Sequence, residues 1–97
     1  MAYIDTDFIS ANLFNGELVP GPNTISEAKF NGILTRVTNF INGVIHSDTD
    51  VDDTHGDLAE VSLCLFRQAI QNQELTLSRT QETLLKGHYK EPRYGHI

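Results

Sequence analysis

The sequence predicts an all-α fold, a small four-helix bundle in which two long central helices are joined by a short N-terminal and a short C-terminal helix. Three observations predict this class. Apolar residues recur every three or four positions over two long stretches. Residue pairs typical of helix N-termini precede two of the expected helices. Short polar connections separate them, which favours antiparallel neighbours.

The first helix is expected over residues 6–14. Asp5 or Thr6 is placed to cap its N-terminus, and Asn15 with Gly16 ends it. Its apolar residues form one broad face, made of Phe8, Ile9, Leu13 and Phe14. A helix of this length depends on packing for its stability.

The second helix is the clearest prediction and is expected from about Ile25 to Ile45. Thr24 and Glu27 fit a capping box, in which the hydroxyl serves the early amides and the carboxylate reaches back. Helical spacing relates the apolar residues Ile33, Val37, Phe40, Ile41 and Val44, and places Asn31, Arg36 and Asn39 outward.

The third helix is expected from Asp57 to about Gln73, after Gly56, with acids in its first turn that suit a helix N-terminus. Its apolar residues cover most of the circumference: Leu58, Val61, Leu63, Cys64, Leu65, Phe66, Ala69 and Ile70. Such a helix is either central in the fold or buried a second time between subunits.

A fourth helix is expected from Arg79 to Lys86, because Ser78 and Gln81 form another capping box. It presents Leu84 and Leu85 to the core. Leu75 to Leu77 is the one stretch that favours local strand pairing. Residues 1–86 are therefore expected to form the helical domain, and residues 87–97 an extended C-terminal interaction tail.

The tail lacks apolar periodicity but is rich in cations and tyrosines, which favour protein interfaces. Pro92 limits the entropy that the segment loses when it becomes ordered. A frayed terminus would explain the same composition. The expected contact residues are His88, Tyr89, Lys90, Pro92, Arg93 and Tyr94.

Charge divides the chain into an acidic front and a basic back. Residues 1–60 hold ten acids against two cations, a net charge of −8, whereas residues 61–97 hold five cations against three acids, a net charge of +2. This asymmetry favours complementary docking with another copy or a neighbouring protein. The overall charge of −6 argues against a surface that wraps nucleic acid.

No pattern in the sequence predicts catalysis, a cofactor or a membrane span. A Gly-rich phosphate loop, a His-Glu-x-x-His motif, a cysteine pair and a nucleophile elbow are all missing. The single Cys64 lies in an apolar run, where a cysteine behaves as a small buried hydrophobe. Because the catalytic motifs are missing, we expect a protein that is not an enzyme. Because the N-terminus does not resemble a secretory signal, we expect it to be made in a cytoplasm.

The acidic loop between the two long helices carries Asp48, Asp50, Asp52 and Asp53. Its alternating acids resemble the opening of an EF-hand calcium loop. That loop needs Gly at its sixth position and a bidentate Glu at its twelfth, where this chain has Asp53 and Ala59. A solvated acidic loop is therefore expected, without a metal; His46 and His55 beside it are expected to be surface residues.

Three segments in this order resemble the head-to-tail connector (adaptor) proteins of tailed bacteriophages and gene transfer agents. They are the opening AYIDTDFISANL, the capped helix in GPNTISEAKFNGILTRVTNFINGVI, and the apolar helix in DVDDTHGDLAEVSLCLFRQAIQNQ, followed by a basic, aromatic tail. The resemblance covers most of the chain. It is carried by the order of elements rather than by one diagnostic residue.

The resemblance implies a structural protein of the virion neck, between head and tail. Twelve copies would form a ring beneath the portal protein and extend the channel for duplex DNA, which passes without specific binding. The tail would contact the portal, although a stopper or tail-completion protein below the ring is an alternative partner. The acidic loop would face the channel, where negative charge repels phosphates, or meet a basic surface of a partner.

A second hypothesis belongs to another class of protein. A small helical regulator, such as an anti-repressor or an antitoxin-like binder, would use the basic tail to bind a protein or a nucleic acid. It would be a monomer or a dimer in solution. A connector would instead be monomeric alone and form a ring on the portal or at high concentration. A packing subunit of an enzyme is a third alternative, which would co-purify with its catalytic partner.

Overall fold

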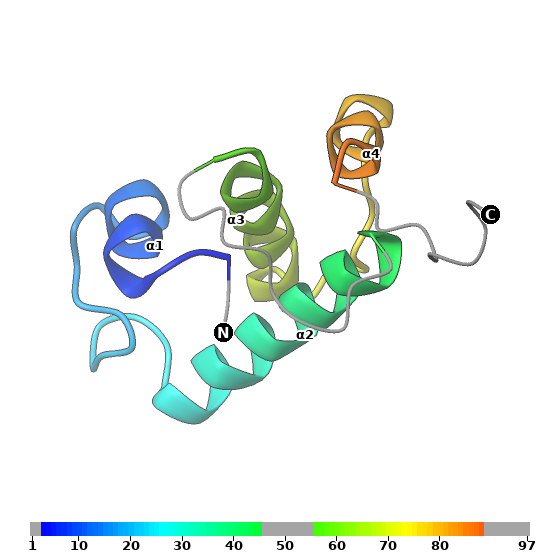
Figure 1. Cartoon of the computed structure of the whole chain (residues 1–97). Helices are drawn as coiled ribbons and strands as arrows, with labels where there is room; N and C mark the ends of the chain where they lie inside the picture. The colour runs from blue at the N-terminus through cyan, green and yellow to red at the C-terminus, as the bar shows by residue number, and fades with distance from the viewer. Residues whose placement is uncertain (1–2, 46–55, 89–97) are drawn as a thin grey trace, which may run out of the picture.

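The computed structural model describes residues 3–45 and 56–88. These residues form four α-helices and no strand, which confirms the all-α class for this part of the chain. The helices are α1 (Thr6–Leu13), α2 (Glu27–Ile45), α3 (Asp57–Ile70) and α4 (Arg79–Lys86). In Figure 1, α1, α3 and α4 lie side by side, with α3 in the middle, and α2 runs beneath them.

The core lies between α2, α3 and α4, which pack on one another. Helix α2 contributes a stripe of buried residues at helical spacing: Phe30, Ile33, Val37, Ile41 and Ile45. The Phe30 ring meets the Phe66 ring of α3 in a tilted arrangement, with 5.5 Å between the ring centroids. The outward positions predicted for Asn31, Arg36 and Asn39 are confirmed, because all three are exposed.

Helix α3 is the central helix of the described part. Its fully or nearly fully buried residues cover a broad face: Leu58, Ala59, Val61, Ser62, Leu65, Phe66 and Ala69. Helices of the same chain already cover this face, as Figure 1 illustrates. Of the two explanations for its apolar circumference, the structure therefore favours the central position within one chain.

The start of α2 differs from the prediction. The helix begins at Glu27, and the Ser26 hydroxyl accepts a hydrogen bond of 3.2 Å from the Lys29 N–H. The Thr24 hydroxyl instead donates to the Leu18 carbonyl oxygen at 2.8 Å. The predicted capping box at Thr24 is therefore wrong. The Thr24 hydroxyl, which was expected to cap the helix, is hydrogen-bonded to a loop carbonyl oxygen outside the helix.

The caps of the two short helices follow the sequence closely. Asp5 caps α1, since its carboxylate accepts a hydrogen bond of 2.8 Å from the Phe8 N–H. Phe14 is the C-terminal cap rather than the last helical residue. In α4 both halves of the predicted capping box between Ser78 and Gln81 are present, and the predicted bounds are confirmed.

Helix α3 ends at Ile70, three residues before its expected end. Asn72 adopts a left-handed conformation, with φ of 58°, that stops the helix. The following segment forms no strand; its backbone pairs with a side chain instead. The Gln68 amide donates to the Thr76 carbonyl oxygen at 3.2 Å and accepts from the Thr76 N–H at 3.0 Å.

Candidate interaction surfaces

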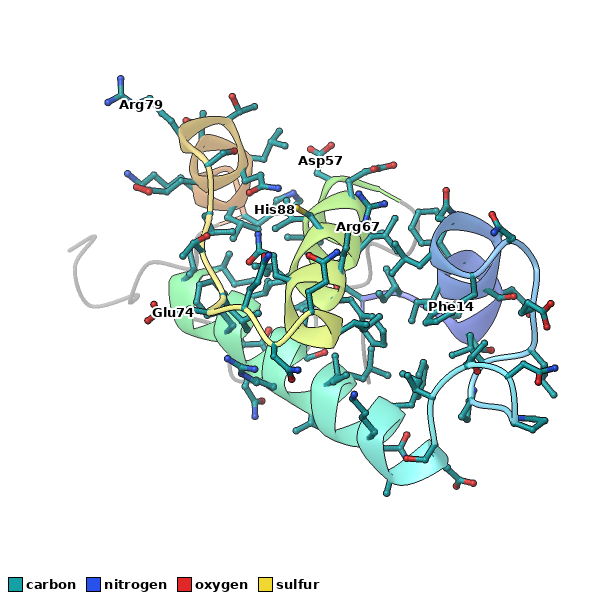
Figure 2. All side chains as sticks on the ribbon, turned by 180° about the vertical axis from the view of Figure 1, so that it is seen from behind. Phe14, Asp57, Arg67, Glu74, Arg79 and His88 are labelled. Carbon is teal, nitrogen blue, oxygen red and sulfur yellow. The ribbon has the colours of Figure 1, made fainter. Side chains whose placement is uncertain are left out.

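The base of the C-terminal tail lies beside the start of α3. Helix α4 ends at Lys86 with Gly87 as its C-terminal cap, and the His88 N–H donates a hydrogen bond of 2.9 Å to the Leu85 carbonyl oxygen. The His88 Nε2 lies 4.0 Å from the Asp57 Oδ2, in the first turn of α3. The labels of Figure 2 show these two residues next to each other. The first residues of the tail, Gly87 and His88, therefore lie at or near the surface, next to the first turn of α3.

Most of the predicted contact residues lie outside the described residues. His88 is the described member of the tail set, and its side chain is 28% exposed. The other members, Tyr89, Lys90, Pro92, Arg93 and Tyr94, lie outside the described part. So do the acidic-loop residues Asp48, Asp50, Asp52 and Asp53, and His46 and His55 beside them. Their roles stay predictions.

A hollow of about 220 Å³ lies between the C-terminal ends of α1 and α3, and we call it the α1–α3 groove. Its lining residues are Asn12, Leu13, Phe14, Arg67, Ile70 and Gln71. Leu13, Phe14 and Ile70 are half-buried and give it apolar walls, whereas the exposed Arg67 supplies a positive charge at its edge. Figure 2 shows Arg67 on the side of α3 that is turned toward α1.

Arg67 forms no ion pair with any residue in the described part of the chain. A guanidinium carries five N–H donors in a planar fork that matches a carboxylate. The groove therefore combines an apolar surface with an unpaired cation. This combination suits an apolar side chain that has an acid next to it.

The loop from residue 16 to residue 25, which we call the Leu18 loop, carries the most exposed large apolar side chain of the described residues. Leu18 is 73% exposed. Its neighbour Glu17 is also exposed and, within the described residues, forms no ion pair. Val19, one residue further along, is buried in the core and anchors the loop.

Hydrogen bonds hold the backbone on both sides of the Leu18 side chain. The Ser10 hydroxyl donates to the Glu17 carbonyl oxygen at 2.5 Å, and the Thr24 hydroxyl donates to the Leu18 carbonyl oxygen at 2.8 Å. Gly21 packs so closely that a Cβ atom there would lie 2.5 Å from the Leu18 carbonyl oxygen. The leucine is therefore presented by an ordered loop, at little cost in conformational entropy on binding.

A second, more open hollow of about 390 Å³ lies between α2 and the segment after α3. Its lining residues are Arg36, Asn39, Phe40, Glu74 and Leu75. It carries one cation and one acid, so its charge does not select a partner of one sign. We assign no ligand to it.

The described residues show no arrangement typical of a metal centre or a membrane anchor. No group of three or more His, Cys, Asp or Glu side chains is placed to hold a metal ion in residues 3–45 and 56–88. Every helix of this part is too short or too polar to span a bilayer. Cys64, expected to be a small buried hydrophobe, is half-buried, and the Gln68 Nε2 lies 3.9 Å from its Sγ.

Sequence reasoning did not identify the Leu18 loop or the α1–α3 groove. The one signal was Glu17-Leu18 between Gly16 and Pro20, an apolar residue in a segment of turn-forming residues. No family model, no curated protein and no solved structure matches this chain.

Proposed function

We propose that this chain is a structural assembly protein, a head-to-tail connector of a tailed bacteriophage or a gene transfer agent. Copies of it would form a ring beneath the portal protein in the neck of the virion. The ring would extend the channel through which duplex DNA enters and leaves the head. In this proposal the helical domain builds the ring and the extended tail, residues 87–97, attaches it to the portal.

One observation carries the proposal: Gly87, the first residue of the expected tail, is exposed directly after α4. Leu85 is the last buried residue among those described, and it is fully buried. The chain then leaves α4 through exposed Gly87 to His88, beside Asp57. A segment that starts in this way is available to a partner without any opening of the core.

The charge of the chain supports the same proposal. Lys86 is exposed at the base of the tail and pairs with Glu82 at 3.4 Å on the surface of α4, which is a weak, solvated contact. The tail beyond it adds Lys90 and Arg93, and Asp57 of α3 lies beside its base at His88. In this proposal the cations of the tail meet an acidic surface of the partner.

Truncation after His88 tests the proposal. This variant retains the described core and the contact between His88 and Asp57, so its circular dichroism and thermal midpoint should match those of the full chain. Negative-stain electron microscopy with the portal of the same genome should show rings for the full chain and none for the truncated chain. A full-length control in which Arg79, an exposed cation of α4, becomes Glu should still form rings.

Three results would contradict the proposal or its assignment of the portal contact to the tail. A full chain that ignores the portal, and forms a stable small oligomer alone, would favour the regulatory protein as the second hypothesis. A truncated chain that unfolds would show that the tail belongs to the domain core. If the truncated chain forms rings on the portal as well as the full chain does, the helical domain and not the tail contacts the portal.

A further inference from the structure

The Leu18 loop and the α1–α3 groove carry complementary apolar and charged groups. The loop presents an exposed leucine with an adjacent carboxylate, at Leu18 and Glu17. The groove presents apolar walls with an adjacent guanidinium, that of Arg67. We propose that the Leu18 loop of one copy docks in the α1–α3 groove of a second copy, and that this is the contact between subunits. The inference rests on the proposed ring and names its interface.

The size of the groove fits a leucine side chain. Its volume is about 220 Å³, whereas an apolar cavity of ~150 Å³ already accepts a molecule as large as benzene. The four carbons of a leucine side chain are smaller than benzene. Leu13, Phe14 and Ile70 then surround the docked side chain, and both partners lose apolar surface to water.

The charges fit in the same arrangement. Glu17 directly precedes Leu18, so a docked leucine brings its carboxylate to the edge of the groove, where Arg67 lies. Neither group forms an ion pair within the described part of its own chain, so docking breaks no existing pair. The pair lies at the rim and contributes orientation and association rate more than affinity.

Docking also requires no large change of the loop. The bonds from Ser10 and Thr24 hold the backbone on either side of the leucine, and Val19 anchors the loop in the core. Because the Leu18 loop is already ordered, it loses little conformational entropy when it binds, and this favours association through a small contact.

The geometry of such a contact determines the kind of assembly. The loop and the groove are two different surfaces, and we take the contact to be head-to-tail, so that a docked pair leaves one free loop and one free groove; a wild type that stops at a closed dimer would contradict this geometry. Further copies then add in the same way, and the assembly closes into a ring or continues as a filament. One isolated contact of this size is weak, which agrees with a monomer at low concentration and a ring on a template.

Sedimentation of the full chain over a concentration series tests the contact. The wild type should self-associate at high concentration. Leu18→Asp should weaken this association roughly 10- to 100-fold, the range expected for the burial of one leucine. Arg67→Glu should also weaken it, and Glu17→Arg combined with Arg67→Glu in one chain should restore it. Arg79→Glu, an exposed cation on α4, is the matched control and should have no effect.

Mixing two variants tests the head-to-tail geometry directly. Leu18→Asp retains a working groove, and Arg67→Glu retains a working loop. Each should self-associate more weakly than the wild type when alone, and the mixture should form a 1:1 pair that grows no further. A wild type that stays monomeric at the highest concentration tested, variants that associate like the wild type, or a mixture that stays monomeric would each overturn the contact.

The outcome is separable from that of the proposed function. If the Leu18 and Arg67 variants behave as expected but the full chain ignores the portal, the contact stands and the connector proposal fails. If the full chain forms rings on the portal and both variants form them equally well, the connector proposal stands and the contact fails. Unchanged circular dichroism of each variant shows that the exposed substitutions leave the fold intact.

Discussion

Replacement of Ser62 by Ala should stabilise the protein, although Ser62 lies at the centre of the fold. Ser62 is on α3 and is fully buried. Its Oγ has no hydrogen-bond partner among the described residues. A hydroxyl that leaves water without gaining a partner opposes folding, so its removal should raise the free energy of unfolding.

The expected gain follows from two terms. An unpaired buried hydroxyl costs about 1–3 kcal/mol relative to its hydrated state. Alanine is also a better helix former than serine, by up to about 0.5 kcal/mol. The void left by one oxygen atom offsets a small part of this gain. Ser62→Ala should therefore raise the free energy of unfolding by about 1–3 kcal/mol, or the thermal midpoint by at least about 4 °C.

Urea denaturation followed by circular dichroism measures this change, and the chain offers a matched control. Ser10→Ala is the same substitution at a serine whose hydroxyl donates to the Glu17 carbonyl oxygen at 2.5 Å. It should destabilise the protein by about 1 kcal/mol. If Ser62→Ala lowers stability by as much as Ser10→Ala does, the Ser62 hydroxyl has a partner and the reasoning is refuted.

Three further substitutions test local interactions. Ser78→Ala removes the N-cap of α4, and should lower the free energy of unfolding by about 1 kcal/mol in urea; no change would mean that packing alone holds α4. Gln68→Ala leaves the Thr76 N–H and carbonyl oxygen without their partner. Gln68→Ala should lower the free energy of unfolding by about 1–2 kcal/mol in the same assay. The same substitution at the exposed neighbour Gln71 is the control. Gly21→Ala forces a Cβ against the Leu18 carbonyl oxygen, so limited proteolysis should cut the loop faster; an unchanged rate would contradict the close approach.

The helices could be predicted because their signals are local. Apolar spacing within α2 and the Ser78 capping box act over a few residues, and the structure has both. The prediction failed where a distant group competes for the same atom. The hydroxyl of Thr24 bonds to the Leu18 carbonyl, and the end of α3 is fixed by Asn72 and by a loop that returns to Gln68.

The candidate contact could not be predicted for a related reason. Exposure of Leu18 depends on the path of the whole loop, since Val19 beside it is buried. Phe14, predicted on the broad apolar face of α1, packs against the core, but it also caps the helix and lines the groove. Only the packing of α1 beside α3 brings it near Arg67, which is 53 residues further along the chain. Spacing within one helix does not contain this information.

The pairing of Gln68 with Thr76 also bears on solubility. Leu75, Thr76 and Leu77 alternate as a β-strand does, and an unpaired strand edge is a template for pairing with other chains. The Gln68 amide occupies the N–H and the carbonyl oxygen of Thr76, which an incoming strand would need. One side chain thus occupies the backbone groups in the middle of this segment and blocks them against intermolecular β-sheet formation.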